Sequence, residues 1–66
     1  MSKSIFKAVC YDMNGLILEP GDAIMCVINK HKYKAYVRKL IGNNQIEVGG
    51  EYDGIIDAAD TYFCPW

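Results

Sequence analysis

The strongest constraint on this chain is a run of six apolar residues, Ala23–Ile28, that follows a turn signal almost immediately. Pro20 and Gly21 predict the turn, because Pro presets φ at the first central position and Gly supplies the left-handed conformation of a type II turn. A strand with one solvated face would alternate apolar and polar residues, and this run does not. We therefore expect a strand covered on both faces, either within the molecule or by another subunit.

The length allows a single domain, residues 1–66, near the lower limit at which a chain buries enough apolar surface to fold. Hydrophobic residues make up 52% and charged residues 23%, which indicates a globular protein rather than a disordered one. No apolar run is long enough to span a membrane, and the first residues lack the apolar region of a signal peptide. We expect a cytoplasmic protein with no membrane contact.

The residue types used in catalysis and metal binding are few and scattered. His31 lies among lysines, where we expect a solvated loop, and Asp57 and Asp60 suit a turn. The cysteines are odd in number and match no metal-binding spacing, so we expect reduced, buried thiols at Cys10, Cys26 and Cys64. We predict no enzyme activity, no cofactor and no metal.

Short apolar segments separated by turn residues predict further strands on both sides of this run. The turns are Asp12–Gly15, with its Asn-Gly hairpin signal, and Gly42–Asn44, while Asn29–Lys32 is predicted as a polar loop. Gly49 and Gly50 are expected to end the strand before them. We predict a short 3₁₀ turn at residues 57–60 and strands at Ile5–Tyr11, Leu16–Leu18, Gln45–Val48, with Ile46 and Val48 inward, and Thr61–Cys64.

The segment Tyr33–Ile41 fits two structures. As a strand it places Ala35 and Val37 inward, and it needs a bulge at Lys39–Leu40 because the alternation fails there. As a helix it has an apolar stripe at i, i+3, i+4, i+7 and i+8, with Gly42 as its stop. We favour the strand because it agrees with the turns and strands on either side, and the chain is then all-β.

Four segments of the chain occur in the same order as the sequence segments that are typical of SH3 domains. They are Ala8–Asp12, Leu16–Val27, Tyr33–Ala35 and Gly54–Asp57. The chain therefore resembles SH3 domains, and through Gly21–Asp22, Tyr33–Val37 and Tyr52–Gly54 it is also similar to Tudor domains. The resemblance implies a small SH3-like barrel of five to six strands with a short 3₁₀ turn near the C-terminus. It also implies a binding module rather than an enzyme.

The resemblance does not extend to the ligand groove of SH3 domains. In SH3 domains this groove is formed by the second aromatic residue of the opening segment, a Trp, a Pro and a Tyr of the closing segment. The corresponding positions here are occupied, in that order, by Met13, Tyr33, Asp57 and Asp60. The resemblance therefore implies the scaffold and the class of function, but not a proline-rich ligand.

Charge is segregated along the chain although its net value is only -1. Five basic residues lie within positions 30–39 without an acid, and from Glu47 onward there are acids but no base. Aromatic residues interleave with the bases, which suits a binding surface because aromatics anchor and cations steer. The predicted binding residues are Lys32, Tyr33, Lys34, Tyr36 and Arg38.

Two functions fit this surface. The first is a non-enzymatic protein-binding module for an acidic or phosphorylated protein surface, similar in size to small phage or mobile-element proteins that engage a host target. The alternative is a nucleic-acid or nucleotide ligand held by the basic aromatic stripe, against which the acidic pI of 5.6 argues. The apolar faces of Ala23–Ile28 further predict a homo-oligomer, most simply a twofold dimer.

Overall fold

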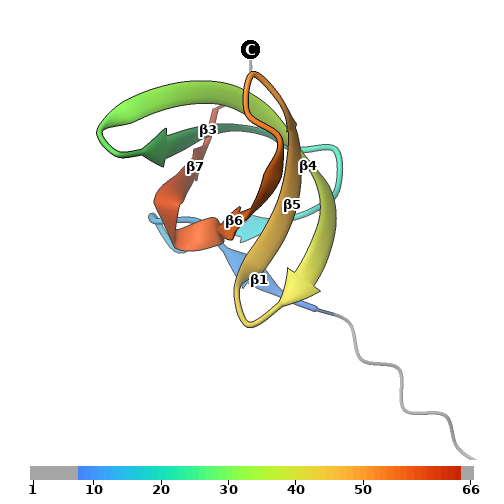
Figure 1. The fold of residues 1–66 in the computed structure, drawn as a ribbon. Coiled ribbons are helices and arrows are strands. Elements are labelled where there is room, and N and C mark those ends of the chain that lie inside the picture. Colours follow the sequence, from blue (N-terminus) through green and yellow to red (C-terminus); the bar gives the residue numbers. More distant parts are fainter. Residues whose placement is uncertain (1–7, 65–66) are drawn as a thin grey trace, which may run out of the picture.

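The computed structural model describes residues 8–64, and in this range the chain forms seven strands and one 3₁₀ turn (Figure 1). Five strands form an antiparallel sheet in the order β6-β5-β4-β3-β7, and the short strands β1 and β2 pair separately. The prediction of an all-β chain with a 3₁₀ turn near the C-terminus is confirmed. The elements are β1 Cys10–Tyr11, β2 Ile17–Leu18, β3 Ala23–Ile28, β4 His31–Gly42, β5 Gln45–Gly50, β6 Gly54–Asp57, η1 Ala58–Asp60 and β7 Thr61–Phe63.

The longest strand, β4, settles the ambiguity at residues 33–41 in favour of the strand. Its first half pairs with β3 from His31 to Tyr36, and its second half pairs with β5 from Ala35 to Gly42. The register with β5 shifts between Val37 and Lys39 and again between Leu40 and Gly42. The single bulge predicted at Lys39–Leu40 is therefore replaced by two irregularities, one on each side of these residues.

Asparagines in the left-handed region form both turns that flank β4. Asn29 and Lys30 have φ of 49° and 70°, and Asn43 and Asn44 have φ of 54° and 61°. Two consecutive positive φ angles match the right-handed twist of a hairpin and allow the next strand to begin at once. The predicted polar loop Asn29–Lys32 is thus too long, since His31 and Lys32 already belong to β4.

The core lies on the inner face of the sheet, where Ala35, Val37, Ile46 and Val48 are buried as predicted. In β3, Ile24 and Cys26 are fully buried, and the other four residues are half-buried. Both faces of this strand are therefore covered to a large extent within one chain. Of the two alternatives predicted for Ala23–Ile28, cover within the molecule agrees with the structure, and the exposed large apolar residues lie elsewhere among residues 8–64.

Several predicted strand ends differ from the structure, most by one or two residues. Gly49 and Gly50 are the last two residues of β5 rather than a break after Val48, and they pair with Tyr36 and Ala35, because a backbone without side chains still forms the ladder. In the predicted strand Ile5–Tyr11, residues 5–7 lie outside the described residues, and β1 begins only at Cys10, where its partner β2 is present.

A buried carboxylate, that of Asp12, organises the loop between β1 and β2. Its Oδ1 accepts hydrogen bonds from the backbone N–H groups of Asn14 and Leu16, both at 2.8 Å. Its Oδ2 accepts one from the N–H of Phe63 in β7 at 2.9 Å. The loop, for which the Asn-Gly pair predicts a tight turn, is therefore held to β7 by the carboxylate of Asp12, a residue that is 4% exposed, and by the N–H of Met13, which donates to the carbonyl oxygen of Thr61 at 2.8 Å.

These bonds predict an acid-sensitive contribution to stability. Burial alone raises the pKa of Asp12, but the hydrogen bonds from Leu16, Phe63 and Asn14 outweigh it and hold the pKa below its ordinary value. The stabilisation is then complete above about pH 4, the ordinary Asp pKa, and is lost as pH falls through the lower pKa of the folded protein. Asp12→Asn should lower the free energy of unfolding at pH 7 by about 2 kcal/mol in urea titrations. The amide has a single acceptor oxygen, so when that oxygen accepts from Asn14 and Leu16, the NH₂ group faces the N–H of Phe63 and cannot accept from it.

The matched control is Asp53→Asn, which removes an acid whose side chain is 72% exposed. Its cost should stay below about 0.5 kcal/mol. The assignment fails if the two variants are equally stable at pH 7, or if acidification from pH 5 to 2 destabilises Asp12→Asn as much as the native chain.

Candidate binding surface

Four of the five predicted binding residues lie together on the outward side of β4. Lys32, Lys34 and Tyr36 alternate along one face of the strand, and each is exposed. Arg38 follows two residues later on the same face, at the first shift in register between β4 and β5. Tyr36 is 44% exposed, so an aromatic ring stands in solvent among cations.

The Arg38 side chain is directed by a glycine on the neighbouring strand. Its guanidinium lies over Gly49 of β5, in the place that a Cβ at this position would occupy. In this position the guanidinium carbon Cζ of Arg38 lies 5.7 Å from the centroid of the Tyr36 ring, and its Nη2 lies 3.6 Å from Oδ1 of Asp53. The cation–π contact and the exposed ion pair together favour a position for Arg38 beside the ring.

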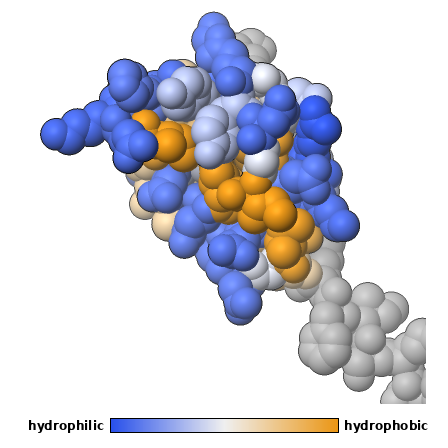
Figure 2. All heavy atoms as spheres, viewed as in Figure 1, coloured by the Kyte–Doolittle hydropathy of each residue, from blue (hydrophilic) through white to orange (hydrophobic). Residues whose placement is uncertain are grey.

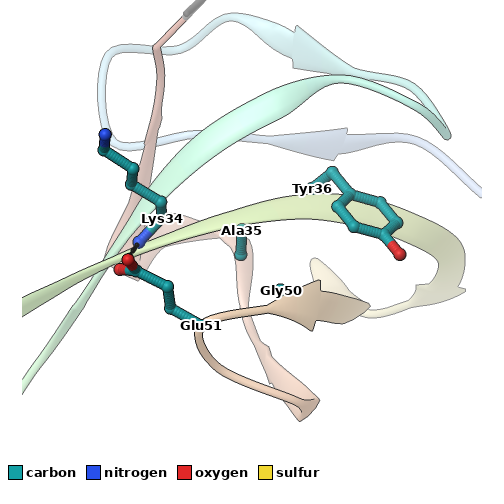
Figure 3. Close-up of a pocket in the computed structure, with 5 residues that line it drawn as sticks. All are labelled: Lys34, Ala35, Tyr36, Gly50 and Glu51. Atoms are coloured by element: carbon teal, nitrogen blue, oxygen red, sulfur yellow. Dashed lines mark hydrogen bonds between the residues drawn. The ribbon is translucent and has the colours of Figure 1, made fainter.

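A hollow of about 340 Å³ lies beside Tyr36, lined by Lys34, Ala35, Tyr36, Gly50 and Glu51 (Figure 3). Gly50 has a φ of 133°, and a Cβ there would lie 2.9 Å from the carbonyl oxygen of Lys34 and 3.0 Å from the Cα of Ala35. Glycine is therefore required at this position for both reasons. Without a side chain at residue 50, the backbone of β5 forms part of the lining.

Glu51 forms the acidic rim of this hollow and continues the β4–β5 pairing beyond the last ladder residues. Its N–H donates to the carbonyl oxygen of Lys34, and its Oε1 accepts from the N–H of Lys34, both at 2.8 Å. Figure 3 shows the carboxylate at the Lys34 backbone, with the Tyr36 ring at the opposite end of the lining residues. The surface therefore combines an exposed ring, two flanking cations and one carboxylate.

Sequence reasoning did not find Gly50 and Glu51. The Gly49-Gly50 pair predicts the end of a strand, although glycine inside a strand also marks a close approach of another group. A close approach at Gly50 could therefore have been predicted from the sequence. Which residue lies opposite each glycine, however, depends on the register of β4 and β5.

The fifth predicted residue, Tyr33, lies on the opposite side of β4 from Tyr36. It shares the inner face with Ala35 and Val37, is half-buried and packs against the core. Its ring centroid lies 5.6 Å from that of Tyr52 and 6.4 Å from the ring of His31. The prediction that Tyr33 and Tyr36 lie on one surface is therefore corrected. The two side chains lie on opposite faces of β4, because residues an odd number of positions apart along a strand point to opposite sides.

Tyr33 should act on stability rather than on ligand contact. Tyr33→Ala removes a ring that packs on Tyr52 and the edge of the core, and we expect a loss of about 2 kcal/mol in the free energy of unfolding. Tyr33→Phe keeps the ring and should cost less than about 0.5 kcal/mol. Chemical denaturation of both variants measures this, and a Tyr33→Ala variant of native stability would contradict the packing role.

The thiols and the single histidine lie in separate environments. Burial raises the pKa of the Cys26 thiol to about 11, and burial also raises that of Cys10, whose Sγ donates to the carbonyl oxygen of Gln45 at 3.5 Å. Cys64 is half-buried, so two of the three predicted buried thiols are confirmed. Among residues 8–64, no three His, Cys, Asp or Glu side chains gather as metal ligands would.

Alkylation kinetics should separate these thiols. At pH 8, iodoacetamide should modify Cys64 much faster than the buried Cys10 and Cys26, because the reactive species is an accessible thiolate. In the Cys64→Ser variant, modification should be slow in buffer and rapid in urea. Rapid labelling of Cys26 in the folded chain, detected by mass spectrometry of peptides, would contradict its burial.

Comparisons with protein-family models, with curated proteins and with solved structures find no match to this chain. No helical element in residues 8–64 has the length and apolar composition that a membrane span needs. The function must therefore be argued from the geometry of the surface itself.

Proposed function

We propose that the chain is a non-enzymatic protein-binding module whose binding surface is the outward side of β4. The observation that carries this proposal is Tyr36, an exposed ring that lies between Lys34 and Arg38 beside a hollow lined partly by glycine backbone. Tyrosine and arginine are the residues that most often dominate binding energy at protein interfaces. Because Arg38 already contacts the ring, little side-chain entropy remains to be lost on binding.

We also propose that the fold is an SH3-like barrel, as the order of the sequence segments suggested. A five-stranded antiparallel sheet with a 3₁₀ turn directly before its last strand is compatible with that family. Fold alone does not imply a ligand, so the functional proposal depends on the surface and not on the resemblance.

The proposed partner is a protein segment that is acidic or phosphorylated and also presents an apolar side chain. The apolar group would enter the hollow against Tyr36, while carboxylates or phosphates would approach Lys32 and Arg38. For a nucleic-acid ligand, the outward side of β4 offers one exposed ring for stacking, that of Tyr36, and the ligand would meet the Glu51 carboxylate at the rim. A protein therefore suits the surface better.

Affinity capture with the immobilised chain tests this proposal, with and without nuclease treatment of the lysate. A protein captured by the native chain and retained after nuclease should bind Tyr36→Ala about 30-fold more weakly, which corresponds to about 2 kcal/mol. Lys32→Ala at the rim should mainly slow association, an effect that fades at high salt. Ile55→Ala, which truncates another exposed side chain outside this surface, is the control.

Two results would contradict the proposal. Capture that disappears after nuclease treatment would favour the nucleic-acid alternative. An unchanged affinity in a folded Tyr36→Ala, Arg38→Ala double variant would exclude this surface as the binding site.

A further inference from the structure

The hairpin formed by β1 and β2 exposes an unusual amount of hydrophobic surface for its length. Five large apolar side chains between residues 9 and 17 are each about half exposed, and we call them the hairpin surface. They are Val9 at 47%, Tyr11 at 47%, Met13 at 47%, Leu16 at 51% and Ile17 at 57%. Hydrophobic surface exposed in one place on a soluble domain commonly marks an interaction site.

The pairing of β1 with β2 places Tyr11 and Ile17, the two residues of the hairpin surface that belong to strands, on the same side of the hairpin. Tyr11 lies directly opposite Ile17, so their side chains share the outward face. The neighbouring pair, Cys10 and Leu18, points the other way and is fully buried in the core. The hairpin therefore has one face in the core and one apolar face in solvent.

Hydrogen bonds hold this hairpin in place from both ends. Asp12 accepts three backbone hydrogen bonds within the loop and from β7, as described above. At β1, the N–H of Tyr11 donates to Oδ1 of Asn44 at 2.7 Å, and Nδ2 of Asn44 donates to the carbonyl oxygen of Tyr11 at 3.2 Å. A partner would thus bind a preformed backbone, which lowers the entropy lost on association.

The hairpin surface is also electrically neutral. Residues 8–18 contain a single charged side chain, Asp12, and its carboxylate is buried. By contrast, the outward side of β4 carries Lys32, Lys34 and Arg38. Figure 2 shows that hydrophobic surface lies between hydrophilic regions on this side of the molecule.

We propose that the chain forms a twofold dimer through the hairpin surface. In such a dimer the same patch of each copy meets its counterpart, so a charged patch would repel itself. That condition excludes the basic side of β4, and it is met by a neutral apolar patch. The occupant of the hairpin surface is therefore a second copy of this chain, in place of the Ala23–Ile28 contact that the sequence suggested.

The usual size of exposed apolar patches sets the strength that we expect for the dimer. An exposed apolar patch on a small domain measures roughly 300–600 Å², so a twofold contact centred on it would bury less than about 1,200 Å² in total. Interfaces of this size are typical of weak, reversible complexes. We therefore expect a dissociation constant on the order of 10 to 100 μM, a concentration range that sedimentation experiments reach.

Sedimentation equilibrium of the full chain tests the dimer, with two variants of the same chemical change. Tyr11→Lys and Tyr36→Lys each replace a strand tyrosine of similar exposure, 47% and 44%, by a cation. The native chain and Tyr36→Lys should shift from the 7.4 kDa monomer toward twice that mass as concentration rises. Tyr11→Lys should weaken the dimer at least about tenfold, and Ile17→Lys should do the same.

Salt gives an independent readout, because a neutral contact should change its dissociation constant less than about twofold between 50 and 500 mM NaCl. The circular dichroism spectrum must match that of the native chain in each variant. A native chain that stays monomeric at about 1 mM, or equal weakening by Tyr11→Lys and Tyr36→Lys, would overturn the proposal. The dimer is separate from the proposed function, since Tyr36→Lys should abolish partner capture while it leaves the dimer intact.

Discussion

The register of β4 is the constraint on which the rest of this structure depends. One strand of twelve residues is shared between two hairpins, so its alternation sets the core contacts of both. A shift by one residue would place Lys34 and Tyr36 in the core and Ala35 and Val37 in solvent. Two asparagine-based turns with positive φ and the buried row of alternating residues together specify the register, and the outward binding surface follows from the same choice.

The Asp12 carboxylate has a complementary role at the place where strand pairing is shortest. β1 and β2 contribute only two residues each to their ladder, which is too little to hold a hairpin by itself. The carboxylate connects this hairpin to β7, and Asn44 connects it to the β4–β5 turn. A small domain with few core residues thus uses charge-assisted hydrogen bonds where a larger one would use more apolar contacts.

The two proposed contact surfaces are separated by their charge. The side of β4 with Lys32, Tyr36 and Arg38 suits a partner of opposite charge, whereas the neutral hairpin surface suits an identical copy. A dimer through the hairpin would leave both basic surfaces free, and two linked sites on one partner assembly would raise the apparent affinity without any new contact. Dimerisation and partner binding would then reinforce each other.

The sequence by itself favoured the all-β class, although it left a helix open at residues 33–41. It also determined the turn at Pro20-Gly21, the 3₁₀ turn before the last strand and, once residues 33–41 form a strand, the inward row Ala35, Val37, Ile46 and Val48. These depend on local backbone preference and on alternation, which neighbouring residues encode directly. Only the tertiary structure decided that Gly50 and Glu51 line the hollow beside Tyr36, and that Phe63 donates to Asp12. These features bring together residues that are far apart in the chain, and a one-residue change in register would reverse them.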